Sequence, residues 1–433
     1  MCPITLSVLC YRFVSYDIAQ ATGGKNDHWS DMMEYLGTED VEPRYILQSK
    51  LSEAGGLFGD VEFYEIYSRI VSIISRLPKG GFCKDYVYMI DELTKDYCLP
   101  VRRVGLFNYI MRLHGGRYIE LIPNDVGSLM GQILHRVLLV RENLQLYDPS
   151  CGVSFLATEV LKRNSGKFDR IVLREVSTLQ ADMARLSLYV NCISQYDLKN
   201  EDFLRDDWVP NERYDAIVSM PAWGIRRRID AVKQGRLSIK YPGFNEVPYD
   251  YACILRGLES LKEDGVMVMA MPMNVLSQQG IGETVRREII TRNDLRAVIG
   301  MPVNMLYSTS VAFVLLVFQH SDRRKDVLMV NAKELYEGHG RLNRMRMSDQ
   351  QRIVLAFSRN RTVPGLSRCV SFDEIAYNKY SWLPSHYVSD PTAEEKNISE
   401  KIKEINELTA QMRAVTREHN EYLRQLGLPE LEL

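Results

Sequence analysis

The sequence predicts an α/β fold, a doubly wound and mostly parallel seven-stranded sheet with a helical N-terminal region and a C-terminal amphipathic helix. Short apolar runs alternate with helix-length amphipathic segments over residues 144–330, as in sheets whose strands are joined by helices. A helical apolar period follows near the end of the chain. We therefore expect a helical domain over 1–119, an α/β domain over 120–357, a linker region over 358–391 and a helical arm over 392–433.

The first part of the chain, from Ile4 to about Ile119, has a mainly helical pattern interrupted by glycine-containing connections. Its opening apolar run, residues 4–10, has no basic segment before it and meets Arg12 before it is long enough for a secretion signal. This run is therefore predicted to be a core helix.

Seven apolar runs predict the strands of the sheet: 144–147, 170–173, 215–218, 266–270, 295–299, 311–317 and 327–330. Most are separated by segments long enough for a helical crossover, which indicates parallel neighbours. The last two are joined only by residues 318–326, a connection too short for such a crossover and long enough for a hairpin. One antiparallel strand at the end of an otherwise parallel sheet is expected.

The tail predicts a long amphipathic helix that ends at Gly427 and Pro429. Apolar residues recur within it at spacings of three, four or seven, at Ile398, Ile402, Ile405, Leu408, Met412, Val415, Tyr422 and Leu426. Two interpretations stay open. The helix either folds back on its own domain or serves as a coiled-coil arm for a partner.

Composition excludes several classes of protein. The 433 residues, 45% of them hydrophobic and 25% charged, are typical of a globular chain with a large core. The 54 Lys+Arg nearly cancel the 56 Asp+Glu, so a nucleic-acid partner would need a local basic patch. No apolar run approaches the roughly 20 residues of a membrane helix, and we expect a cytoplasmic protein without a membrane contact. Eight scattered cysteines, without a C-x-x-C pair or a histidine at ligand spacing, predict reduced thiols and no metal.

Polar residues at the ends of the first two strands are candidates for a nucleoside cofactor. Asp148-Pro149 and Gly152 follow the first strand, and Gly152 would let a ligand approach the backbone closely. Glu175 ends the second strand, where such folds hydrogen-bond ribose hydroxyls. Either feature alone is more often a turn or a helix cap, whereas their order favours a cofactor site. The absence of G-x-G-x-x-G disfavours a dinucleotide and a hydride-transfer enzyme.

The motifs resemble those of the modification subunits of type I restriction-modification systems, Rossmann-like DNA adenine-N6 methyltransferases that use S-adenosylmethionine. The resemblance rests on Asp148-Pro-Ser-Cys-Gly-x-x-Phe155-Leu, Leu173-Arg-Glu-Val176, Glu201-Asp202-Phe-Leu204, Tyr214 to Gly224, Gly265 to Leu276, Ala297 to Tyr307, Gly340 to Arg344, Tyr387-Val388 and the terminal helix.

The resemblance implies roles for particular residues. It implies that S-adenosylmethionine is held, without a metal, by Pro123, Asp148, Pro149, Gly152, Phe155, Glu175 and Asp202. It places Met220, Pro221, Ala222 and Trp223 at the catalytic motif that usually reads Asn-Pro-Pro-Phe. The implied partners are DNA, a specificity subunit bound through the terminal helix, a second copy of the chain and a restriction subunit.

Four positions depart from the family pattern. Methyl transfer to an exocyclic amine needs acceptors for the amino hydrogens, and the Met220 thioether is only a weak acceptor. The Pro221 carbonyl and an aromatic face at Trp223 remain, whereas Ala222 loosens the backbone and Ser154 can crowd a ligand. Ile122 replaces a threonine, so a hydroxyl is lost. Two functions follow: an active methyltransferase, or a catalytically degenerate scaffold that binds DNA or partners.

A basic segment follows the catalytic motif. Residues 224–243 carry one Asp and six basic residues, Arg226, Arg227, Arg228, Lys233, Arg236 and Lys240. Such a run is usually a solvated face, but directly after the base-binding motif it is suited to DNA phosphates. A second cluster, Arg341, Arg344 and Arg346, is expected to extend it. Cys151 is interpreted as a small packed residue and not as a nucleophile.

Overall fold

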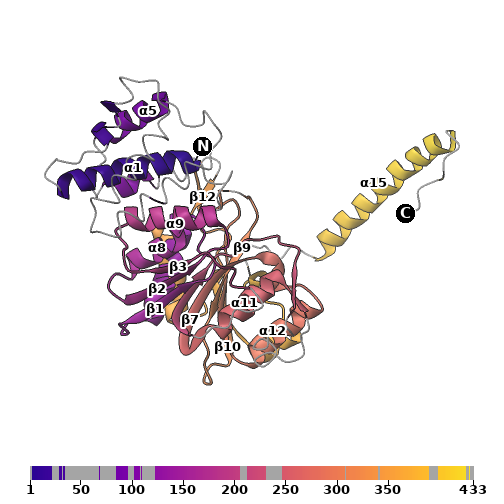
Figure 1. Cartoon of the computed structure of the whole chain (residues 1–433). Helices are drawn as coiled ribbons and strands as arrows, with labels where there is room; N and C mark the ends of the chain where they lie inside the picture. The colour runs from indigo at the N-terminus through magenta and orange to yellow at the C-terminus, as the bar shows by residue number, and fades with distance from the viewer. Residues whose placement is uncertain are drawn as a thin grey trace.

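The computed structural model describes residues 2–21, 29–31, 33–34, 68, 84–95, 102–107, 109, 122–204, 212–230, 246–307, 309–339, 342–389, 398–425 and 429. Its centre is a nine-stranded sheet in the order β13-β10-β8-β9-β7-β4-β1-β2-β3 (Figure 1). The strands are β1 Leu144–Asp148, β2 Phe168–Arg174, β3 Asp197–Lys199, β4 Tyr214–Ser219, β7 Leu261–Pro272, β8 Leu295–Gly300, β9 Phe313–Phe318, β10 Asp326–Asn331 and β13 Ser367–Ser371.

The predicted fold class is confirmed, and each of the seven predicted runs forms a strand. The pairs β4–β7, β4–β1, β1–β2, β2–β3 and β8–β10 are parallel, whereas β9 and β13 run against their neighbours. The prediction of seven strands was too low because β3 and β13 were missed. Both are short and mostly polar, so they lack the apolar run that marked the others.

The predicted hairpin between the last two apolar runs was wrong. β9 lies between β7 and β8, and β10 lies on the other side of β8. The connection 319–325 passes around the start of β8, where Gln319 N donates to Asp294 O at 2.8 Å and Arg324 Nη2 donates to Asn293 O at 3.1 Å. Since neighbouring strands lie about 4.8 Å apart, this connection is long enough to pass over one strand.

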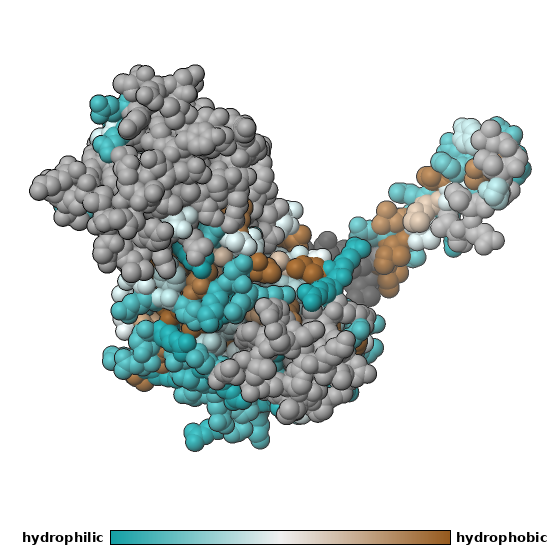
Figure 2. Space-filling model, in the orientation of Figure 1, coloured by the Kyte–Doolittle hydropathy of each residue, from teal (hydrophilic) through white to brown (hydrophobic). Residues whose placement is uncertain are grey.

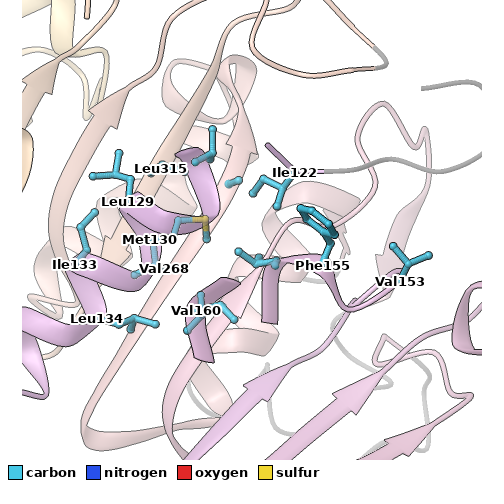
Figure 3. Close-up of a cluster of buried hydrophobic side chains, with 14 of the residues drawn as sticks. Ile122, Leu129, Met130, Ile133, Leu134, Val153, Phe155, Val160, Val268 and Leu315 are labelled. Atoms are coloured by element: carbon cyan, nitrogen blue, oxygen red, sulfur yellow. The ribbon is translucent and has the colours of Figure 1, made fainter. Parts of the chain in front are cut away.

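Helices cover both faces of the sheet and bury alternate side chains of each strand. In β7, Val266, Val268 and Ala270 belong to one apolar cluster, and Met267 and Met269 belong to the other. The first cluster includes side chains of α7 Asn124–Val137, α8 Phe155–Arg163, α9 Thr178–Val190 and α13 Met347–Ser358. Figure 3 shows the part of it that α7 and α8 contribute. The second includes those of α11 Tyr249–Glu259, η1 Met273–Leu276 and α12 Ile281–Thr291.

The segment expected as a linker, 358–391, is largely part of the sheet domain. β13 pairs with β10, and it is followed by α14 Phe372–Tyr377 and η2 Pro384–His386. Trp382 is fully buried and its backbone N–H donates to Leu276 O at 2.8 Å. Two short ladders complete the domain: β5 Arg228–Asp230 with β6 Glu246–Pro248, and β11 Glu337–His339 with β12 Leu342–Arg344.

Helices α1 Cys2–Ala21 and α5 Lys84–Thr94 represent the predicted helical N-terminal region. The buried Arg103 guanidinium donates to both carboxylate oxygens of Asp17 in α1, at 2.6 and 2.7 Å. Asp17 also accepts a hydrogen bond from the hydroxyl of Tyr189 in α9. A charge-assisted network therefore joins α1 to the sheet domain. The predicted boundary at residue 119 lies outside the described residues.

The tail forms the predicted helix, α15 Ile398–Gln425, which projects away from the sheet domain (Figure 1). Its apolar side chains Ile402, Ile405, Leu408, Met412, Val415 and Tyr422 are 52–60% exposed, and apolar surface follows the helix in Figure 2. Among the helices the structure describes, none has the length and hydropathy needed to cross a bilayer.

Candidate functional site

A pocket of about 440 Å³ lies where β1, β2 and β4 end. The carboxyl ends of parallel strands share one edge of the sheet, so residues far apart in sequence meet there. Of the residues expected to hold a cofactor, Asp148, Pro149, Gly152, Phe155, Glu175 and Asp202 line the pocket. Pro123 precedes α7 and does not line it, whereas its neighbour Ile122 does.

Asp148 is the buried acid at the end of β1. Its Oδ1 accepts a hydrogen bond from Ser150 N at 3.1 Å, and the Ser150 hydroxyl lies 2.7 Å from that of Ser219 at the end of β4. Its Oδ2 is buried and has no hydrogen-bond partner among the described residues. Burial, reinforced by the nearby Glu175 charge, raises the pKa of Asp148 to about 8. One carboxylate oxygen is thus left for a ligand that donates a hydrogen bond or carries positive charge.

The turn after β1 has left-handed backbone at two positions. Gly152 has φ +55°, which a glycine adopts without strain. Ser154 has φ +59°, so it retains the conformation that favours glycine. The Ser154 side chain is fully buried and does not line the pocket. The expected crowding of a ligand by Ser154 is therefore not seen.

Glu175 joins the turn after β1 to the turn after β2. Its Oε2 accepts a hydrogen bond from Gly152 N at 2.9 Å, and its Oε1 accepts one from Ser177 N at 2.8 Å. Burial raises the pKa of Glu175, while these backbone donors oppose the shift. The acid both lines the pocket and organises the backbone around it.

Asp202 connects the pocket to the start of the basic segment. Its Oδ1 accepts a hydrogen bond from Leu204 N at 2.9 Å, and its Oδ2 lies 3.6 Å from Nη1 of Arg227. The Arg227 carbonyl in turn accepts a hydrogen bond from the backbone N–H of Tyr249, which lines the pocket.

The four residues of the expected catalytic motif have different surroundings. Met220 and Ala222 line the pocket, and Pro221 is buried beside them. The Trp223 indole N–H donates to Ala270 O at 3.3 Å, and its ring lies 5.7 Å from the Phe313 ring. These contacts with β7 and β9 hold the indole half-buried beside the pocket rather than in its lining.

Several lining residues were not predicted. Val176 and Ser177 lie between β2 and α9, Gln180 lies in the first turn of α9, and Tyr249 is the first residue of α11. Helix packing brings Gln180 and Tyr249 to the pocket, and no motif in the sequence marks these two residues. Ser177 and Gln180 are signalled only by their position shortly after Glu175.

The basic residues are only partly described. Arg226 and Arg227 are exposed, and Arg228 begins β5. The remaining members, Lys233, Arg236 and Lys240, lie outside the described residues.

Two members of the second basic cluster, Arg344 and Arg346, are paired with acids. Arg344 Nη1 lies 3.7 Å from Asp125, and Arg344 Nη2 donates to the Tyr307 hydroxyl at 2.9 Å. Arg346 donates to Asp349 at 2.8 Å. Arg341 lies outside the described residues, as do residues 231–245 before β6. Among the residues that are described, no three His, Cys, Asp or Glu side chains group as metal ligands would.

A model of the N-6 DNA methylase family matches residues 114–396, more than half of the chain. The chain therefore belongs to the N-6 DNA methylase family. The match contains the whole sheet and the pocket.

Two relatives carry the name of type I restriction enzyme methylase subunits. The chain is 21% identical over 302 residues to the MpnII subunit of Mycoplasma pneumoniae, a match covering 65% of this chain and 54% of that protein. It is 23% identical over 299 residues to the MjaVII subunit of Methanocaldococcus jannaschii, covering 63% and 51%. The chain thus spans about half the length of each relative.

Solved structures agree on the fold. The methyltransferase subunit of a type I restriction-modification system from Streptococcus thermophilus has a TM-score of 0.72 at 17% identity, covering 89% of this chain and 93% of that one. A chain from a study of type I system assembly has a TM-score of 0.60 at 14% identity, covering 98% and 94%. The expected resemblance to type I modification subunits is confirmed.

Proposed function

We propose that this chain is a type I-like modification subunit that binds S-adenosylmethionine and DNA and transfers a methyl group to adenine N6 together with a specificity subunit. The observation that carries the proposal is the convergence of Asp148, Gly152, Glu175 and Asp202 on one pocket in a chain of the N-6 DNA methylase family.

The charges of the pocket support this ligand class. Asp148, Glu175, Glu201 and Asp202 line it, and among the described residues no lysine or arginine does. An acidic lining favours a ligand with positive charge and opposes one that carries phosphates. S-adenosylmethionine has a sulfonium and an ammonium group, and its ribose hydroxyls and adenine amino group are hydrogen-bond donors. The unpartnered Asp148 Oδ2 is suited to one of these donors.

When bound, the cofactor would supply an electrophilic methyl group. The chain's own residues would position the amine that receives it. The Pro221 carbonyl would accept a hydrogen bond from the adenine amino group, and Met220 would contribute a weaker sulfur acceptor. Trp223, fixed by Ala270 and Phe313, would offer an aromatic face to a flipped base.

The basic residues that follow Trp223 supply the DNA contact in this proposal. Exposed Arg226 and Arg227 lie directly after the motif, so phosphates bound there would be held beside the base-binding residues. The apolar face of α15 is the proposed contact with the specificity subunit. A second copy of the chain and a restriction subunit are further proposed partners.

The test is a calorimetric titration of the full chain with S-adenosylmethionine and its demethylated product. A methyl-transfer assay on adenine-containing DNA follows, with the specificity subunit present. Cofactor binding with transfer is the expected result. Absence of cofactor binding would overturn the proposal.

A second candidate function rests on Met220, which lines the pocket where the family motif has a carboxamide or carboxylate. A thioether is a poor partner for amino hydrogens. In this alternative the chain is a catalytically degenerate scaffold that keeps the fold to bind DNA or partner subunits. Cofactor binding without methyl transfer, in the presence of the specificity subunit, would support it.

A further inference from the structure

A second pocket, of about 590 Å³, lies between α7, the end of α8 and α13. It is formed by other residues than the acidic pocket, and its lining has the opposite charge. Its polar lining is Gln132, His135, Arg136, Arg163 and Gln351. None of the described residues that line it carries a carboxylate.

Among the described residues, no acid forms an ion pair with either arginine of this pocket, Arg136 or Arg163. Two nearby basic residues do form ion pairs: Lys162 with Glu159 at 2.8 Å, and Arg346 with Asp349 at 2.8 Å. These two paired cations do not line the pocket, whereas Arg136 and Arg163 line it and are exposed to solvent.

The remaining polar groups give the pocket a fixed wall. Gln132 Nε2 donates to Gln350 Oε1 at 2.7 Å, and the same oxygen accepts from the Ser128 hydroxyl at 3.0 Å, so α7 and α13 are joined at this point. One turn further along α7, His135 Nδ1 is buried and has no hydrogen-bond partner among the described residues. A buried ring nitrogen without a partner is costly unless a ligand or water satisfies it.

We propose that this pocket binds an oxyanion of the phosphate class, held between the Arg136 and Arg163 guanidinium groups with His135 as a further donor. Arginine forks match the geometry of phosphate oxygens. The phosphate belongs either to a small phosphorylated ligand or to the backbone of DNA. Because Arg136 and Arg163 lie in the last turns of α7 and α8, the helix dipoles oppose an anion. We therefore expect weak binding, with a Kd on the order of 1 mM.

The test compares two double variants of the full chain. Arg136→Gln with Arg163→Gln removes the charges of the pocket. The control, Arg287→Gln with Arg323→Gln, removes the same charge from exposed positions on α12 and on the connection after β9. Inorganic pyrophosphate is titrated by calorimetry, and a labelled DNA duplex is titrated by fluorescence anisotropy, both at low ionic strength. Circular dichroism and thermal unfolding check that each variant is folded.

We expect the pocket variant to weaken binding of at least one probe by about fivefold or more, and the control to change it by less than about twofold. A loss with pyrophosphate identifies a small phosphorylated ligand, and a loss with DNA alone identifies backbone phosphates. Three results would each overturn the proposal. The two double variants could weaken binding equally, the pocket variant could leave binding unchanged, or the unmodified chain could bind neither probe. His135→Phe, which keeps both arginines, should give a smaller loss in the same direction.

Discussion

Glu175 accepts a hydrogen bond from the backbone N–H of Gly152 at 2.9 Å, so the acid directly after β2 holds the turn that follows β1. The second oxygen of the same carboxylate accepts from Ser177 N. Two of the loops that line the pocket therefore have their relative position set by one side chain. A residue expected only to contact a ligand also builds the site for it.

Glu175→Ala should weaken binding of S-adenosylmethionine by about tenfold or more, because hydrogen bonds to a charged group contribute about 1.5–3 kcal/mol each. Calorimetric titration measures the change. Glu175→Gln is the matched control, since its amide oxygen can still accept from one backbone N–H. The Gln variant should retain part of the affinity that the Ala variant loses. Unchanged affinity in Glu175→Ala would show that the pocket is assigned to the wrong ligand.

The strands were predictable because burial of a sheet on both faces requires apolar runs, as in β9, where every residue is buried. The order of the strands in the sheet was not predictable. β9 takes its place by pairing with β7 and β8, and the apolar content of a strand does not specify which strands it pairs with. β13 was not predicted because its Ser-Arg-Cys-Val-Ser sequence is mostly polar, as suits a strand at the edge of a sheet.

The acids of the pocket were predictable for a different reason. Parallel strands end at one edge, so Asp148 and Glu175 had to lie near each other. Tyr249 and Gln180 reach the pocket through the packing of α11 and α9, which no local pattern reveals. The position of Trp223 depends on Ala270 and Phe313, which belong to distant strands.

Cofactor binding should depend on pH through Asp148. Burial raises the pKa of Asp148 from the ordinary 3.8 to about 8, so the folded chain keeps a proton that the unfolded chain releases above about pH 4. This group therefore lowers the free energy of unfolding as pH rises from about 4 to about 8. A cationic ligand favours the charged carboxylate, so its affinity should rise over the same range, by at most about tenfold per pH unit.

Calorimetry with the demethylated product from pH 6 to 8 measures this dependence. Asp148→Asn cannot ionise, so its affinity should be weaker and should vary much less with pH. An affinity of the unmodified chain that stays constant or falls with rising pH would contradict a cationic ligand beside Asp148.

The catalytic motif offers a gain-of-function experiment. Met220→Asn combined with Ala222→Pro should raise methyl transfer to adenine by about 100-fold or more, because a positioned acceptor in such a site is worth about 3–4 kcal/mol. The assay uses DNA and the specificity subunit. Met220→Leu with Ala222→Pro is the control that restores the backbone without the acceptor. If the Asn variant gains nothing over this control, the defect does not lie in the motif alone.

The apolar face of α15 should be needed for assembly and not for folding. Leu408 and Val415 are exposed, so replacing both with lysine removes no contact with the sheet domain. We expect an unchanged midpoint of thermal unfolding and a loss of association with the specificity subunit, since charges in a helix–helix seam are strongly unfavourable. Size-exclusion chromatography with light scattering measures the association.

The opposite face of α15 supplies the control for this experiment. Ala410→Lys with Ala414→Lys adds the same charge away from the apolar stripe, and association should persist. Deletion of every residue after Asp390 should give the same result as the lysine variant at Leu408 and Val415: a folded chain that no longer joins its partner. Retained association in the deletion would place the partner's contact on the sheet domain and exclude α15 as the arm.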